Sequence, residues 1–224
     1  MYEYIFQMPQ GEVLKFDIAT MKKKASKVLP DWTRLDHKQC PNCPLSIEET
    51  TYCPAALDVV DIISTFKHYK SFQQVKVRVI GREREYFKKC DLQTAVNSLL
   101  GLVMANSECP YLSMFKVMSK YHLPFSSIEE STQRTLSFYL FEQFVIATKN
   151  GQPDWSLQAL LERYEALKVV NTYFVKRIND YEDHNDAHIN SVVRFFTLSS
   201  LIEVSMDKIL NEVDYTPIKV SQNV

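Results

Sequence analysis

Residues 40–54 read CPNCPLSIEETTYCP and contain three of the five cysteines of the chain. The pair Cys40 and Cys43 has the Cys-x2-Cys spacing that places two sulfurs within reach of one metal ion across a tight turn. Around this pair, residues 20–54 show no clean hydrophobic period and hold four of the nine prolines. A long segment without regular structure is uncommon inside a compact domain unless something ties it down. A metal centre at the cysteines would tie it down.

Proline follows four of the five cysteines, and Cys90 is the exception. Proline has no backbone N–H and a fixed φ, so it stiffens the turn after a ligand, and it is favoured as the first residue of a helix. Cys53 and Cys109 each precede a stretch expected to be helical, where free N–H groups and the helix dipole stabilise a thiolate. We therefore predict one metal centre with four ligands: Cys40, Cys43, Cys53 and Cys109.

Several chemistries fit four cysteines at this spacing. Structural Zn²⁺ in a closed four-cysteine site is the first choice, and a [4Fe–4S] cluster is the alternative, since proline also follows ligand cysteines in ferredoxin-type runs. A thiol–disulfide pair at Cys40 and Cys43 would need to end a strand and open a helix, which Pro44 and the irregular flanks disfavour. Buried free cysteines would explain neither the spacing nor the prolines.

The first part of the chain, residues 1–90, predicts a small antiparallel sheet. Residues 2–7 and 14–18 alternate in hydrophobicity around a turn, and residues 75–79 and 84–88 form a second hairpin around Gly81. Residues 55–69 have the apolar spacing of a helix between the two hairpins. This part is therefore ββ–loop–α–ββ, and its tyrosine-rich first strand is expected at a sheet edge, where a partner or a second copy could add.

Residues 91–224 show helical periodicity and predict a bundle of about five helices, which packs with the first part as one globular unit of α+β class. Ser127 and Glu130 have the spacing of a capping box at the start of one helix. The expected helices span residues 92–106, 110–121, 127–149, 154–182 and 187–213.

Other polar residues are expected to be structural. His37, three residues before Cys40, is predicted to be an exposed loop residue, with a role behind a ligand sulfur as the alternative. His184 and His188 share the i, i+4 spacing of a helical metal site but lie in a polar stretch between helices. Glu142 lies in an apolar run and would need an ion-pair partner, such as Arg134 or a lysine of another helix.

The bulk composition narrows the classes of function. The net charge of −1 provides no long-range attraction to nucleic acid or to an anionic membrane. No secretory signal is apparent, and no apolar run approaches the ~18 residues of a membrane span. We expect a cytoplasmic protein in a reducing compartment, where clustered cysteines bind metal rather than form disulfides.

Five short strings carry a resemblance to known proteins. They are CPNCPL at 40–45, YCP at 52–54, SLLGL at 98–102, CP at 109–110 and HLPF at 122–125. With them, nearly the whole chain resembles a family of uncharacterised bacterial proteins, a domain of unknown function with a CPNCPL…YCP…CP cysteine set. The resemblance implies a helical second half beside the cysteine set, and it implies no activity, substrate or partner.

The sequence predicts a non-catalytic, metal-bound regulatory or protein-interaction module, because the cysteine set looks closed and no acid, base and nucleophile converge. Its partner would be another protein or a second copy of the chain. Three alternatives stay open. They are an iron–sulfur protein that senses oxidants or passes electrons, an enzyme with zinc in an open site, and a nucleic-acid-binding protein that uses Lys22, Lys23, Lys24 and Lys27.

Overall fold

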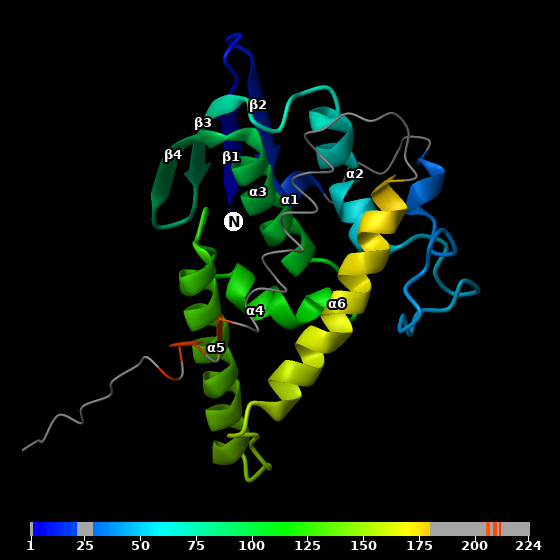
Figure 1. The fold of residues 1–224 in the computed structure, drawn as a ribbon, viewed down its shortest axis with the longest axis vertical. Helices are drawn as coiled ribbons and strands as arrows, with labels where there is room; N and C mark the ends of the chain where they lie inside the picture. Colours follow the sequence, from blue (N-terminus) through cyan, green and yellow to red (C-terminus); the bar gives the residue numbers. More distant parts are fainter. Residues whose placement is uncertain (1, 22–28, 180–204, 207, 210, 212–224) are drawn as a thin grey trace, which may run out of the picture.

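A four-stranded antiparallel sheet forms one layer of the fold (Figure 1). The structure, a computed structural model, describes residues 2–21, 29–179, 205–206, 208–209 and 211. The strand order is β2-β1-β3-β4, and every neighbouring pair is antiparallel. The two predicted hairpins are confirmed, as is the α+β class. The strands are β1 (Glu3–Gln7), β2 (Val13–Asp17), β3 (Gln74–Ile80) and β4 (Glu85–Asp91).

The position of β1 corrects one expectation. The tyrosine-rich first strand was expected at a sheet edge, but β1 lies inside the sheet, where Tyr4 has Phe16 as its partner on one side and Val79 on the other. Both backbone edges of β1 are therefore paired, and the expectation of an edge on this strand was wrong. Alternating hydrophobicity tells which face of a strand is buried, but strand order depends on pairings between distant segments.

Two helices cover one face of the sheet: α2 (Pro54–Phe66) and α3 (Leu92–Ala105). Phe66 of α2 contacts Phe6 of β1, with ring centroids 5.0 Å apart. Along β3, Val75, Val77 and Val79 are buried toward the helices, while the residues between them are exposed on the other face. This period of two places the hydrophobic core between the sheet and the two helices.

The helical half follows the predicted boundaries where local signals are strong. The expected helices at 92–106 and 127–149 are confirmed as α3 and as α5 (Ile128–Thr148). The capping box is present, with Ser127 and Glu130 each accepting the other's backbone N–H. The expected helix 187–213 lies mostly outside the described residues. The remaining elements are α1 (Ile18–Met21), η1 (Asp31–Thr33), η2 (Leu112–Phe115), α4 (Lys116–Ser119), α5 (Ile128–Thr148) and α6 (Gln158–Asn179).

Two helix predictions needed correction. Residues 110–121, expected as one helix, form the 3-10 turn η2 and the single turn α4. The helix expected from residue 154 begins at Gln158, because the Asp154 carboxylate accepts hydrogen bonds from Ser156, Ala159 and Tyr139 and holds a turn instead. From this turn α6 returns along the molecule toward the loop that precedes α2 (Figure 1).

A buried polar chain joins the sheet to the loop after α4. The Tyr4 hydroxyl lies 2.7 Å from the Ser98 hydroxyl and 2.6 Å from Nε2 of His122. Ser98 accepts a hydrogen bond from the Phe125 N–H. Both hydroxyl hydrogens of the chain find an acceptor if Ser98 donates to Tyr4 and Tyr4 donates to His122. This assignment makes His122 a neutral ring that accepts at Nε2 and carries its proton on Nδ1.

The His122 ring makes stability depend on pH. Burial, assisted by the Arg134 guanidinium, lowers the pKa of His122 from 6.5 to about 3. Below pH 6.5 the His122 ring is protonated in the unfolded chain, whereas in the folded chain it stays neutral until the pH is near 3. The free energy of unfolding therefore decreases as the pH is lowered from 6.5 to 3. We expect the native protein to lose about 3 kcal/mol more than His122→Gln between about pH 7 and about pH 4. Urea unfolding at both pH values measures this difference, and parallel losses in the two proteins would contradict it.

Candidate metal centre

The four predicted ligands lie in one region of the structure. The pKa of the Cys40 thiol is affected by Cys53, Cys43 and Cys109, and the pKa of Cys109 by Cys53 and Cys43. Because electrostatic influence decays with distance and screening, these sulfurs share one region. Cys90 lies elsewhere, in β4, where its register partner is Val75.

Hydrogen bonds close the turn that carries Cys40 and Cys43 and join it to two distant segments of the chain. The Cys43 N–H donates to the Cys40 carbonyl over 2.9 Å, which closes the turn. Between the two cysteines, the Asn42 side chain donates to the Ala166 carbonyl of α6 over 3.0 Å, and the Asn42 carbonyl accepts from the Tyr111 hydroxyl over 2.7 Å. Tyr111 is two residues after Cys109, so Asn42 links the turn to the segment of the distant fourth cysteine.

Cys53 is positioned by a short strand-like pairing and by α2. Its N–H donates to the Thr33 carbonyl over 2.8 Å, and the Leu35 N–H donates to the Thr51 carbonyl over 2.9 Å. The residues between them, Arg34 and Tyr52, form an isolated antiparallel bridge. Cys53 is then the N-cap residue of α2, with Pro54 in the first turn, as the Cys-Pro spacing predicted.

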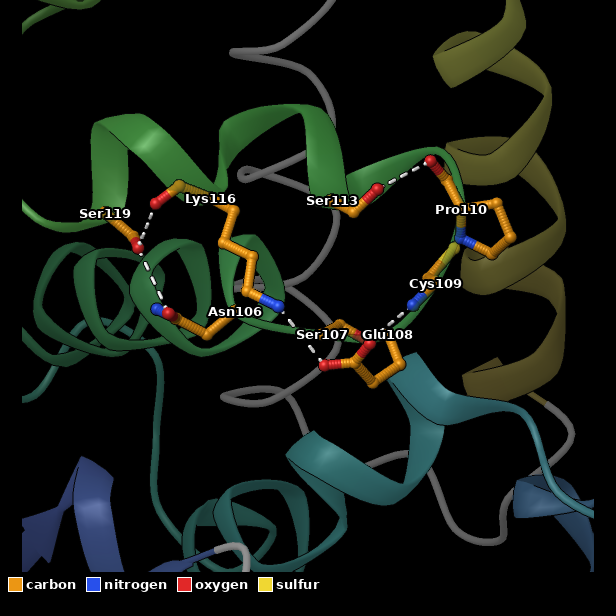
Figure 2. A network of polar contacts seen from close by, with 8 residues as sticks. All are labelled: Asn106, Ser107, Glu108, Cys109, Pro110, Ser113, Lys116 and Ser119. Carbon is orange, nitrogen blue, oxygen red and sulfur yellow. Dashed lines mark hydrogen bonds and ion pairs between the residues drawn. The ribbon is translucent and has the colours of Figure 1, made fainter.

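Cys109 lies in a loop with its own polar network (Figure 2). The buried Ser107 hydroxyl accepts from the Cys109 N–H over 3.2 Å, and the Cys109 carbonyl accepts from the Ser113 N–H over 2.9 Å. Figure 2 also shows the Ser113 hydroxyl donating to the Pro110 carbonyl over 2.8 Å. These bonds hold the backbone on both sides of the cysteine, so the direction of its side chain is set before any ligand is bound.

Burial and the helix ends act on the thiols in opposite directions. Burial raises the pKa of Cys53 and Cys109, and raises that of Cys40 to about 12. Backbone N–H groups at Ala55 and Ala56 lower the pKa of Cys53, although none makes a full capping hydrogen bond to its sulfur, and those of Leu112 and Tyr111 lower that of Cys109. The expected effect of the N–H groups is present, but burial outweighs it. Metal binding would therefore have to displace protons from these thiols.

A buried arginine lies beside the thiols. Arg177 of α6 is 2% exposed, and its guanidinium donates to the carbonyls of Trp32, over 2.7 Å, and of Arg34. A third bond reaches the Leu35 carbonyl over 3.3 Å. The same positive charge lowers the pKa of both Cys40 and Cys53. None of the ion pairs found between described residues includes Arg177.

The other candidate residues have structural surroundings. His37 is partly buried rather than exposed, and its N–H donates to the Arg34 carbonyl within the loop. Glu142 is 47% exposed and pairs with Arg163 over 2.9 Å. The expected ion pair is therefore present, but the carboxylate is not buried and its partner is neither Arg134 nor a lysine. A residue within an apolar stretch of a helix can lie at the border between the buried and the exposed face, and sequence spacing alone does not reveal this. Lys22, Lys23, Lys24, Lys27, His184 and His188 lie outside the described residues.

Sequence reasoning missed Asn42, Tyr111 and Arg177, which surround the cysteines. Asn42 had a signal, because it stands inside the Cys-x2-Cys turn, where an amide side chain can fasten the loop. Arg177 had one too, since it stands between Phe174 and Ile178 in an apolar stripe of α6. The sequence could not predict which groups these side chains contact, because the contacts join distant segments. Arg177 and Trp32, for example, are 145 residues apart.

The described residues lack two further features. No helix among them is both long enough and apolar enough to cross a membrane. No group of three or more His, Cys, Asp or Glu side chains in the described ranges already has an arrangement that could hold a metal ion. The cysteines are thus neighbours that would have to converge further to share one ion.

Comparison with known proteins places the chain in a family. No curated protein and no solved structure gives a significant match. A family model, described as Domain of unknown function (DUF6901), matches residues 1–216. That match covers nearly the whole chain, and the chain therefore belongs to the DUF6901 family, a domain whose function is unknown.

Proposed function

We propose that Cys40, Cys43, Cys53 and Cys109 bind one Zn²⁺ ion, and that the protein is a non-catalytic regulatory or interaction module built around it. The observation that carries the proposal is the hydrogen bond from Tyr111 to Asn42, which holds the turn of Cys40 and Cys43 against the segment of Cys109. Electrostatic contributions to the pKa values of Cys40 and Cys109 from the other cysteines support it. Unrelated buried cysteines have no reason to meet in one place, whereas thiolate ligands of a single ion must.

The geometry of zinc sets what has to change on binding. Zn–S bonds of about 2.3 Å in a tetrahedron put the sulfurs about 3.8 Å apart. Cys40, Cys43 and Cys53 are partly exposed and lie in or beside loops, so zinc binding would require this loop to bring their sulfurs closer to that of Cys109. Cys109 is the buried member, and its network makes it the fixed point of the site.

The charge of the site supports a thiolate centre. Four thiolates and one divalent ion carry a net charge of about −2, which is costly to bury without a compensating cation. Arg177 supplies a buried positive charge whose field already reaches Cys40 and Cys53. The guanidinium would therefore gain an anionic neighbour on metal binding, and the centre would gain a counter-charge.

A non-catalytic role follows from the ligand set. Four protein ligands fill a tetrahedral site and leave no position for water or substrate. Exposed Phe141 and Phe144 of α5, with Trp155 just after it, support an interaction with another protein or a second copy. None of the five cysteines forms a disulfide, which supports a reducing compartment such as the cytoplasm.

A [4Fe–4S] cluster is the second candidate, because the same four thiolates and the same Arg177 charge would suit it. Metal analysis and a visible spectrum of protein purified without air separate the two. About one zinc per chain and no colour support the proposal. Iron with sulfide and a broad visible absorption band would show that the site holds a [4Fe–4S] cluster instead of zinc. Protein without metal, which also takes up neither zinc nor a reconstituted cluster, would refute the four-cysteine site.

A further inference from the structure

A second site lies apart from the cysteines, in a cavity of about 540 Å³. It is bounded by α3, the η2–α4 segment, the following loop and the first half of α5, with Lys88 of β4 and Tyr164 of α6 also at its wall. Its volume falls within the ~300–1,000 Å³ range of small-molecule sites. Leu102, Phe115 and Met118 give it apolar walls, and Asn97, His122 and Arg134 add polar groups. No cysteine is among the described residues that line it.

The charged groups of the cavity favour an anion. Among the described lining residues are two cations, Lys88 and Arg134, and one carboxylate, Glu130. The Glu130 carboxylate already accepts the Ser127 N–H in the capping box, over 2.7 Å. No ion pair found between described residues includes Lys88 or Arg134. Glu130 also acts electrostatically on Arg134, so two cations and one carboxylate leave the cavity a net charge of +1.

Lys88 projects from the edge strand β4 toward the cavity. In the β3–β4 register it is paired with Val77, whose side chain is buried on the helix-covered face. Lys88 therefore projects from the same face, and its Nζ lies 5.7 Å from the centre of the Phe125 ring at the cavity wall. Its neighbour Lys89 is paired with Lys76 and belongs to the open face.

Arg134 and Asn97 add direction and an unused acceptor. Arg134 donates through Nη2 to the Tyr121 carbonyl over 2.8 Å and to the Met118 carbonyl over 3.3 Å, which fixes its guanidinium at the wall. The Asn97 side-chain oxygen is buried and has no hydrogen-bond partner. A buried acceptor without a partner costs free energy, which a ligand donor would recover.

We propose that this cavity binds a small carboxylate with an apolar body and a hydroxyl or amide donor. The carboxylate would interact with Lys88 and Arg134, the apolar body would contact Leu102, Phe115 and Met118, and the donor would satisfy Asn97. The Tyr4–His122–Ser98 chain holds the wall between sheet and loop in one arrangement, so the cavity is formed before the ligand enters.

The test uses 3-(4-hydroxyphenyl)propionate and its uncharged counterpart, 3-(4-hydroxyphenyl)propan-1-ol. Isothermal titration should show one propionate bound per chain. The alcohol should bind at least about tenfold more weakly, because the charge-assisted hydrogen bonds are lost. Lys88→Gln should weaken propionate binding about tenfold, while Lys89→Gln on the opposite face should leave it unchanged. Both lysines are exposed, so neither variant is expected to unfold the protein.

Three results would overturn the proposal. They are no binding of the propionate at millimolar concentration, equal binding of acid and alcohol, and equal affinities in the Lys88 and Lys89 variants. The last result would show that the probe binds at another surface, such as the exposed aromatic residues of α5. The test does not involve the cysteines, so its outcome is independent of the proposed metal centre.

Discussion

Replacing Cys43 or Cys109 with serine is expected to remove the metal from the purified protein, whereas Cys90→Ser is expected to leave it bound. A serine hydroxyl does not ionise at neutral pH and is a poor zinc ligand, so the site would lose one of its four bonds. Structural zinc contributes about 10–16 kcal/mol of apparent binding free energy in small domains, so the loss of even a fraction is measurable. Metal content per chain, measured after gel filtration, reads out the change directly.

The same variants should loosen the loop that carries the first three ligands. In the native protein the turn at Asn42 is held to Ala166 and Tyr111 by two hydrogen bonds, and the proposed ion would close the remaining side. We expect faster limited proteolysis within residues 29–53 of Cys43→Ser and Cys109→Ser. Cys90→Ser is the matched control, since it removes a partly buried thiol from β4 and leaves Cys40, Cys43, Cys53 and Cys109 unchanged. Equal metal content in all three variants would remove the site assignment.

The parts of the fold that sequence predicted well are those governed by neighbours along the chain. The two hairpins, the start of α2 after Cys53 and the capping box at Ser127 each depend on a few consecutive residues. The order of the strands was missed because it is decided by the pairing of β1 with β3, which are about 70 residues apart. Hydrophobic alternation is the same in a central and an edge strand when one face is buried.

In the candidate metal centre, too, local sequence features could be predicted and long-range contacts could not. The cysteine spacing and the prolines predict the four thiols of the proposed centre, because ligand chemistry restricts residue type. The groups that hold them were not identified, because their contacts are long-range. Tyr111 bonds Asn42 across 69 residues, and Ala166 bonds it across 124. The cavity beside α3 was also missed, since its lining comes from four separate segments that carry no common motif.

Arg177→Met is expected to destabilise the protein by about 3–5 kcal/mol, because it removes the donor for two buried carbonyls and one partly buried carbonyl at once. Those carbonyls belong to Trp32, Arg34 and Leu35, in the loop before the cysteines. Lys176→Met, one residue earlier on the exposed side of α6, is the matched control and should change stability by about 0.5 kcal/mol or less. Urea unfolding of the two variants beside the native protein measures both effects.

Arg177→Lys separates the two roles of this side chain. Lysine keeps the positive charge but lacks the planar fork that reaches several carbonyls, so it should recover zinc affinity more fully than stability. Competition with a chelator, in conditions where each variant remains folded, measures the affinity. We expect Arg177→Met to lose zinc to the chelator about tenfold more readily than the native protein, and Arg177→Lys to fall near the native value. If both variants hold zinc as the native protein does, the guanidinium only fastens the loop, and its charge does not stabilise the thiolate centre.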